Sequence, residues 1–175
     1  GMLAALAACS GEAPLAAGEQ WVTLPGGQKI RAEVLTRPED MQRGMMFRNS
    51  LAPDRGMLFV HNAPGRYPYW MFQCLIPLDI IWMDANRKIV EISADTPPCR
   101  GEASTCPSYG GHQDSQYVLE LAGEMARRYG LKLGDTIAFC LVLVCAGLDM
   151  DRGPGRAHPV SQAAGIPHRR RGPRP

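Results

Sequence analysis

The chain has 175 residues, of which 45% are hydrophobic and 21% are charged. This size and composition indicate about one globular domain with its own core, and the 19 glycines and 15 prolines argue against a coiled coil or a helical bundle. A net charge of +2 is too small to indicate a nucleic-acid-binding protein, and no apolar run reaches the ~20 residues that a membrane-spanning helix needs.

The first residues form an apolar run that ends at a cysteine and continues into a small, polar segment. The stretch Leu6-Ala7-Ala8-Cys9 resembles the lipobox of bacterial lipoproteins, in which the cysteine thiol takes the diacylglyceryl group. Acyl chains on Cys9 would tether the protein to a membrane. We therefore expect residues 1–19 to be a lipobox remnant and a flexible linker. The alternative is an Ala-rich segment with a chance cysteine, because no basic residue precedes the run.

About seven strands and two short helices are predicted between residues 20 and 145, in one domain. Residues 20–35 are expected to form a hairpin, and Thr36 with Glu39 a capping box for a helix over 37–45, with Met41 and Met45 on one side. The further strands are expected at 57–60, 69–72, 78–83, 88–94, 117–121 and 136–144, and the second helix at 123–129. The strands at 78–83 and 88–94 are expected to form a second hairpin around a turn at 84–87. The pattern predicts a mainly β (α+β) fold, either a small β-barrel or a sandwich.

The C-terminal segment differs in composition from the predicted domain. Residues 149–175 contain six arginines and two aspartates, many prolines and glycines, and hardly any large apolar side chain. Such a segment buries too little surface to offset its ordering entropy. We therefore predict a disordered basic tail over 146–175, either a solvated extension or an anion-binding arm.

Six cysteines bear on the cellular compartment and on the chemistry. Cys99 and Cys106 flank a loop of small and polar residues, which in an exported protein is typical of a disulfide. Closing that ring would contribute about 2.5 kcal/mol in the chain-entropy model. Zinc with His112 as third ligand, or two free thiols, are the alternatives. Cys140 and Cys145 are expected to be buried apolar thiols. Cys74 is the thiol nearest to a possible site.

Several sequence blocks, in order over about residues 28–140, resemble the signature of the DUF192 family. The blocks are Gly44-Met45-Met46-Phe47-Arg48, Arg55-Gly56-Met57-Leu58-Phe59, Trp70-Met71, Ile76-Pro77-Leu78-Asp79-Ile80-Ile81, Pro97-Pro98-Cys99, Cys106-Pro107-Ser108-Tyr109, Val118-Leu119-Glu120-Leu121-Ala122-Gly123 and Gly134-Asp135. The resemblance implies a compact, mostly β domain that is often exported, and it implies no particular reaction. The family usually has Lys-Asn-Thr after the Trp-Met pair, where this chain has Phe72-Gln73-Cys74.

Asp79 is the most informative charged residue, because it stands in an apolar run and a buried carboxylate must be paired or hydrogen-bonded. Arg48 is the expected partner, since guanidinium binds carboxylate through two hydrogen bonds. The pair would lie beside Trp70 and Gln73. It would be either a structural lock or part of a ligand pocket.

Two further features make candidates for a site. Trp70 belongs to an aromatic cluster with Tyr67, Tyr69 and Phe72, and such side chains serve either as core or as a platform for sugar rings. Glu120 is another acid between apolar neighbours, so, like Asp79, it would be either a structural residue or part of a ligand pocket.

No phosphate loop, metal-ligand pair or hydrolase motif occurs in the sequence, so neither a catalytic residue nor a metal or other cofactor is predicted. We expect a membrane-tethered, exported module on the periplasmic face of a bacterial membrane. It would bind a small molecule, a glycan or a protein, with Arg48, Trp70, Gln73, Asp79 and Glu120 as candidate contacts. The alternative is an envelope enzyme that acts on a glycan or peptide, with Asp79 or Glu120 as acid or base. A Cys74–His nucleophile is a remoter possibility.

Overall fold

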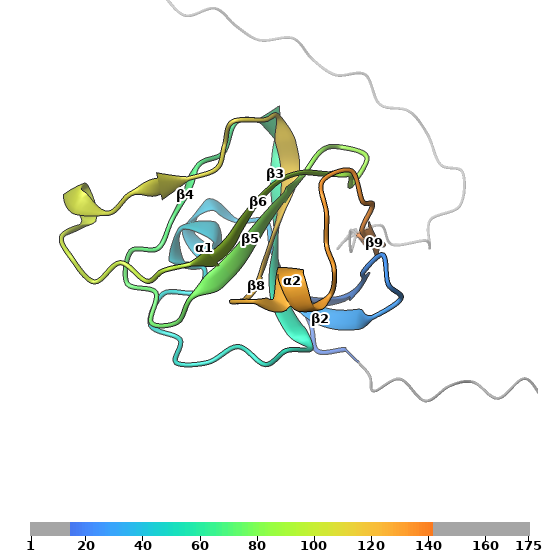
Figure 1. Ribbon diagram of the computed structural model, residues 1–175, viewed down its shortest axis with the longest axis horizontal. Helices are drawn as coiled ribbons and strands as arrows, with labels where there is room; N and C mark the ends of the chain where they lie inside the picture. Colours follow the sequence, from blue (N-terminus) through green and yellow to red (C-terminus); the bar gives the residue numbers. More distant parts are fainter. Residues whose placement is uncertain (1–14, 142–175) are drawn as a thin grey trace, which may run out of the picture. The chain divides into compact units, whose positions relative to one another are not determined.

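A curled seven-stranded sheet is the main element of the protein, whose computed structural model describes residues 15–141 (Figure 1). Its strands are β1 (Glu19–Thr23), β2 (Lys29–Leu35), β3 (Arg55–Gly65), β5 (Leu78–Met83), β6 (Ile89–Thr96), β8 (Ser115–Ala122) and β9 (Ala138–Phe139). The remaining elements are α1 (Pro38–Arg43), α2 (Met125–Arg128), a 3₁₀ turn (Ala103–Thr105), and the small ribbon of β4 (Tyr69–Trp70) and β7 (Ser108–Tyr109). The predicted mainly β fold is confirmed.

The strand order in the sheet is β6-β5-β8-β3-β2-β1-β9. The β2–β3 pair is parallel and the other neighbours are antiparallel. The two predicted hairpins, β1–β2 and β5–β6, are confirmed. Each is closed by a short turn that supplies the tight reversal an antiparallel pair needs.

The two ends of this strand order approach one another, which curls the sheet into a half-barrel. The segment before β9 is hydrogen-bonded to the start of β6: Ile89 N–H donates to the carbonyl of Asp135 at 2.8 Å, and Ile137 N–H donates to that of Arg87 at 3.0 Å. These contacts join segments at opposite ends of the strand order, so the sheet closes on itself in part.

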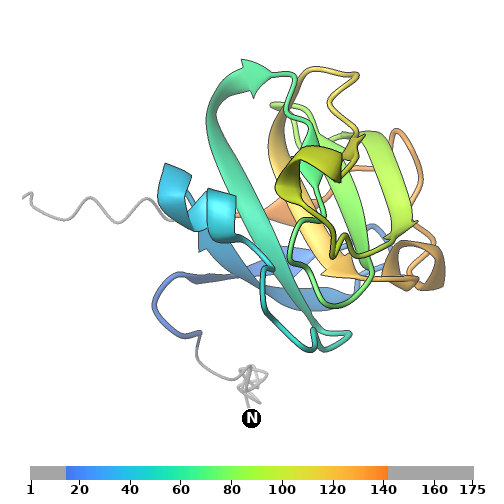
Figure 2. The ribbon, with the colours of Figure 1, turned by 90° about the vertical axis from the view of Figure 1, so that its left-hand side faces the viewer.

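Both faces of the sheet are covered, which explains why all six residues of β5 are buried. One face carries the core that contains Leu58, Ile81 and Leu119, and α2 packs against it. The other face carries a second core, which contains Phe59 and Trp82. Met41 of α1 packs against this second core. The two helices lie on opposite sides of the domain (Figure 2). Successive residues of a strand therefore point into different cores.

The first helix differs from the predicted one in its start and its end. Its N-cap residue is Arg37, without a side-chain capping bond, so the predicted capping box of Thr36 and Glu39 is wrong. The Glu39 carboxylate is bound by the guanidinium of Arg37. The helix ends at Arg43, so Met45, which is buried, lies beyond it.

The end of the described chain also differs from the prediction. The last strand spans only β9, paired with β1, where a strand over 136–144 was expected. Cys140 follows it and is exposed, so its predicted burial is wrong, because it has left the ladder that covers its neighbour Phe139. The predictions for Cys9, Cys145 and the tail over 146–175 lie outside the described residues.

Candidate functional site

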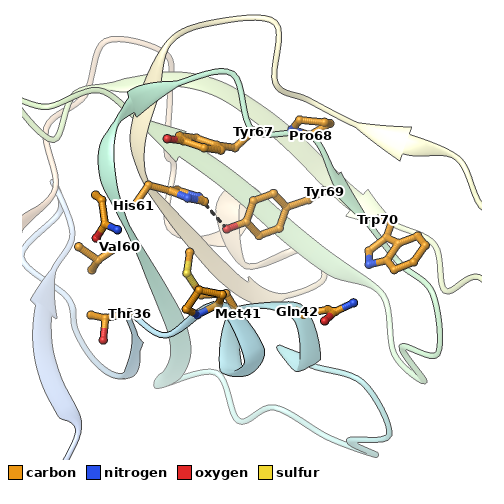
Figure 3. Close-up of a pocket in the computed structure, with 11 residues that line it drawn as sticks. Thr36, Met41, Gln42, Val60, His61, Tyr67, Pro68, Tyr69 and Trp70 are labelled. Carbon is orange, nitrogen blue, oxygen red and sulfur yellow. Dashed lines mark hydrogen bonds between the residues drawn. The ribbon is translucent and has the colours of Figure 1, made fainter. Parts of the chain in front are cut away.

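A cleft of about 530 Å³ lies between α1 and the segment that runs from the end of β3 into β4 (Figure 3). We call it the aromatic cleft, and it is lined by Thr36, Pro38, Met41, Gln42, Val60, His61, Asn62, Tyr67, Pro68, Tyr69 and Trp70. Among the residues that the structure describes, no arginine, lysine, aspartate or glutamate lines it. Its walls combine aromatic faces with amide and hydroxyl groups, which is typical of a site for an uncharged ligand.

The aromatic wall is held by hydrogen bonds to the main chain. The indole N–H of Trp82, a fully buried side chain of β5, donates to the carbonyl of Tyr67 at 2.8 Å. The Tyr67 hydroxyl donates to the carbonyl of Ala63 at 2.7 Å. Its ring stacks on His61, with 3.5 Å between ring centroids and 2° between planes. This wall is therefore ordered before any ligand arrives.

His61 and Tyr69 form the polar centre of the same wall. The His61 Nε2 atom and the Tyr69 hydroxyl are hydrogen-bonded at 3.2 Å, as Figure 3 shows. Burial lowers the pKa of His61, and burial followed by the nearby Glu120 charge raises the pKa of Tyr69. Both groups are therefore neutral at pH 7, and the cleft is uncharged there as well.

Trp70 stands at the edge of the cleft, with 37% of its surface exposed. Its ring lies 5.2 Å from that of Phe72, centroid to centroid, although Phe72 lies beyond the end of β4. A large aromatic side chain that is left partly in water beside a cleft can stack on a ligand ring.

Glu120 lies behind this wall, next to a second and much smaller cavity of about 30 Å³. We call this cavity the inner chamber. Four of its lining residues are shared with the aromatic cleft, and the others are Arg43, Gly44, Met45, Met46, Phe59, Phe72, Cys74 and Glu120. Glu120 is 4% exposed, and no residue of the described chain donates a hydrogen bond to its Oε2 atom. Burial raises its pKa to about 8, and Arg48 lowers it by a smaller amount.

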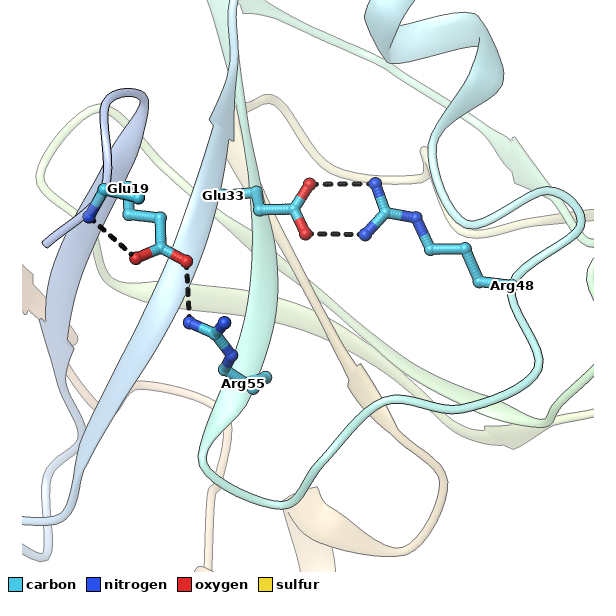
Figure 4. Close-up of polar contacts among 5 residues, drawn as sticks. Glu19, Glu33, Arg48 and Arg55 are labelled. Atoms are coloured by element: carbon cyan, nitrogen blue, oxygen red, sulfur yellow. Dashed lines mark hydrogen bonds and ion pairs between the residues drawn. The ribbon is translucent and has the colours of Figure 1, made fainter.

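The predicted pairing of Arg48 with Asp79 is wrong. The guanidinium of Arg48 binds the Glu33 carboxylate through two hydrogen bonds, at 2.5 and 2.8 Å, close to the contact of Arg55 with Glu19 at 2.6 Å (Figure 4). Arg48 and Glu33 line a different hollow, of about 400 Å³. Arg48 therefore acts at a distance from the aromatic cleft.

Asp79 is satisfied by backbone groups. Its carboxylate, fully buried on β5, accepts hydrogen bonds from the N–H groups of Asp95 at 2.6 Å, Glu124 at 3.2 Å and Ala126 at 2.5 Å. It thereby fixes the end of β6 and the start of α2. These three donors occupy both of its oxygens, so Asp79 has a structural place in the fold.

Gln73 contributes through its backbone. It has a positive φ of 56°, its N–H donates to the carbonyl of Cys99, and its carbonyl accepts from the N–H of Phe47. It joins three loops and does not line the aromatic cleft. Of the five predicted contacts, Trp70 and Glu120 line the two adjoining cavities, while Arg48, Gln73 and Asp79 lie elsewhere.

The sequence reading missed His61 and the two α1 residues Met41 and Gln42 as parts of a site. His61 is an isolated histidine in the sequence, and α1 looks like an ordinary amphipathic turn. The signal that could have found His61 is its place before a Pro/Gly loop that leads directly into the aromatic cluster. Loops of this kind often carry binding residues.

The predicted disulfide is confirmed. Cys99 and Cys106 are bonded, with 5.8 Å between their Cα atoms. His112, the third ligand of the zinc alternative, contacts the Glu91 carboxylate instead, at 2.5 Å from Nδ1 to Oε1. Cys74 is a buried free thiol whose pKa is raised to about 12, by burial first and by the Glu120 charge second. Such a thiol is a poor nucleophile at neutral pH.

Two kinds of feature are absent from residues 15–141. No helix there is long and apolar enough to cross a membrane. No group of three or more His, Cys, Asp or Glu side chains there is placed to hold a metal ion.

The sequence pattern of the DUF192 family, described as "Uncharacterized ACR", matches residues 21–139. A crystal structure of a protein of unknown function from Novosphingobium aromaticivorans is 31% identical, with a TM-score of 0.59, over 69% of this chain and 83% of that chain. A protein from Sinorhizobium meliloti, described provisionally as a transcription regulator, is 27% identical, with a TM-score of 0.61, over 74% and 98%. Among curated proteins, none is significantly similar. With its family pattern over most of the chain, this protein belongs to the DUF192 family.

Proposed function

We propose that the protein is a binding module whose aromatic cleft takes an uncharged ligand with a ring face, such as a neutral sugar. The observation that carries the proposal is the combination of a partly exposed Trp70 with a cleft of about 530 Å³ that no described charged side chain lines. Aromatic faces bind the apolar side of a ring, and the Gln42 and Asn62 amides can hydrogen-bond its hydroxyl groups.

The test is to titrate the protein with neutral saccharides and to measure binding by isothermal calorimetry and by tryptophan fluorescence. Trp70→Ala should weaken binding by up to about tenfold, since stacking on an aromatic side chain contributes about 0.5–1.5 kcal/mol. Trp21→Phe is the matched control, because Trp21 on β1 does not line the cleft. Equal binding by both variants would place the ligand elsewhere, and no binding by the wild type would remove the proposal.

A second candidate function is an envelope enzyme that acts on a glycan or peptide. One observation favours it: Glu120 has a pKa raised to about 8 beside a cleft, which suits a general acid at neutral pH. Asp79 is a poor candidate for that role because its oxygens are taken by backbone N–H groups. Release of reducing sugar or of free amines by the wild type, and its loss in Glu120→Gln, would favour the enzyme.

We also propose that the module is exported and tethered to the periplasmic face of a bacterial membrane through Cys9. The lipobox-like stretch supports a lipid anchor, and the Cys99–Cys106 disulfide supports an oxidising compartment. With a complete signal peptide in a bacterial host, the protein should be found in the membrane fraction. Cys9→Ser should move it to the soluble fraction, and equal membrane association of the two forms would contradict the anchor.

A further inference from the structure

Glu120 is a buried acid for which the fold provides no complete set of partners. It lies on β8, opposite Met57 on one side and Ile80 on the other, within an otherwise apolar core. A buried carboxyl oxygen without a hydrogen bond is costly, and such atoms are rare in folded proteins. By contrast, the other fully buried acid, Asp79, receives three backbone N–H groups. The Oε2 atom of Glu120 thus lacks a hydrogen-bond partner among residues 15–141.

The inner chamber gives this carboxyl a position next to the aromatic cleft. Met41, Gln42, Tyr69 and Trp70 line both cavities, so the cavities adjoin along these four residues. A ligand ring that lies against Trp70 is therefore close to the entrance of the inner chamber. Met41 and Gln42 are flexible side chains on α1, seen below the aromatic wall in Figure 3, and can adjust to a group that enters.

The size of the inner chamber limits what can enter it. A volume of about 30 Å³ has room for about two or three water molecules. A ring cannot fit, but a substituent of two heavy atoms can. A hydroxymethyl group has this size, and its hydroxyl both donates and accepts hydrogen bonds, as a neutral carboxyl does.

The charges around the chamber favour an uncharged substituent. Glu120 is neutral at pH 7 because burial raises its pKa to about 8. The Tyr69 hydroxyl and the Cys74 thiol are neutral there as well. Two arginines lie near the chamber. The guanidinium of Arg48 is held by Glu33, and Arg43, which lines the chamber, is exposed to water, which screens its charge.

We propose that the inner chamber is a recognition subsite of the aromatic cleft that takes the hydroxymethyl group of a neutral hexose-like ring, with the Glu120 carboxyl as its hydrogen-bond partner. This inference rests on the proposed binding function and adds the class of ligand. It makes Glu120 a specificity-determining residue, because a ring that lacks the terminal hydroxyl leaves the buried carboxyl unpartnered.

The experiment compares methyl glycosides of glucose, galactose and N-acetylglucosamine with their 6-deoxy counterparts, which differ by one hydroxyl group. Affinities are measured with the full chain by ligand-observed NMR and calorimetry at about pH 6. Wild-type protein should bind at least one parent glycoside on the order of tenfold more tightly than its 6-deoxy form. Glu120→Met, which has similar volume and no hydrogen-bonding carboxyl, should reduce this preference to near unity.

A pH series on Glu120→Gln makes the test independent of Glu120→Met. The amide keeps a neutral donor and acceptor at every pH, so this variant should keep its preference for the parent glycoside from about pH 6 to about pH 9. The preference of the wild type should change over the same range, because ionised Glu120 loses its donor and can only accept a hydrogen bond from the ligand hydroxyl. Near-UV circular dichroism and thermal midpoints show that each variant is folded.

The outcomes separate the two proposals. If the glycosides bind and Trp70→Ala weakens them, but the parent and 6-deoxy forms bind equally, the inner-chamber subsite is wrong and the binding function stands. If wild type and Glu120→Gln show the same pH dependence of the preference, the role of the Glu120 proton is wrong. If no glycoside binds, the proposed function is overturned and this inference with it.

Discussion

Replacing Glu120 by glutamine should stabilise the protein at neutral pH. The carboxyl is buried in an apolar core, where its charged form is costly, so the folded state holds the proton up to a pKa of about 8. In the unfolded chain the same group has its ordinary pKa of 4.5. Glutamine fills nearly the same space and never ionises. The variant therefore lacks the ionisation penalty that the wild type carries.

The sign and the size follow from these two pKa values. The raised pKa in the folded state means that stability is fully present below about pH 4.5 and is lost as pH rises toward 8, where it levels off. Each pH unit in this window corresponds to about 1.4 kcal/mol, so the wild type should lose roughly 3 kcal/mol between pH 4.5 and pH 7 through this group. The free-energy difference between Glu120→Gln and wild type should grow by that amount.

Urea unfolding of both proteins at several pH values from about 4.5 to 8.5 measures this difference, and subtraction removes the contribution of groups that the two proteins share. Glu102→Gln makes the same chemical change at an exposed position and reports the effect of the exchange itself. A difference between Glu120→Gln and wild type that stays constant over the whole pH range would refute the reasoning. It would mean that the carboxyl ionises in place, with partners or water that stabilise its charge.

Three further changes test the fold. Asp79→Ala should lower the free energy of unfolding by roughly 3 kcal/mol or more, because it leaves three backbone N–H groups without their charged acceptor; a loss below 1 kcal/mol in urea unfolding would contradict this. Gly110→Ala should be strongly destabilising, since its φ is +64° and a Cβ would lie 2.3 Å from the Trp82 ring; an unchanged thermal midpoint would show that the loop moves aside. Reduction of the Cys99–Cys106 disulfide should cost up to about 2.5 kcal/mol, and equal midpoints with and without reductant would show that the loop is ordered without it.

The local elements of this protein were readable from the sequence because they depend on neighbouring residues. The β5–β6 hairpin follows from two apolar runs on either side of a turn, and the turn at 84–87 forms as expected, with the Asp84 carboxylate accepting from the N–H of Asn86 at 2.8 Å. The disulfide followed from two cysteines that flank one short loop. The exceptions were ends of elements, such as the start of α1, where Arg37 is the N-cap residue and no side chain forms a capping bond.

The partners of buried charges were decided by the tertiary structure. The sequence showed that Asp79 and Glu120 would be buried, since each stands in an apolar strand. It could not show that Asp79 would meet N–H groups of residues 95, 124 and 126, because those backbone groups are brought together only by the packing of β6 and α2 against β5. Alternation then sends Asp79 and Glu120 to opposite faces of the sheet.

The composition, the mainly β fold, the disulfide and the aromatic cluster were thus determined by the sequence alone, since each depends on residue type and short spacing. The cleft was decided by the tertiary structure, because α1 and the β3–β4 segment become its two walls only when the sheet curls and both faces are covered. His61 is an isolated histidine in the chain and a wall residue in the fold. Glu120 acquires its raised pKa for the same physical reason: burial of a charge is a property of the packed core and of no single stretch of sequence.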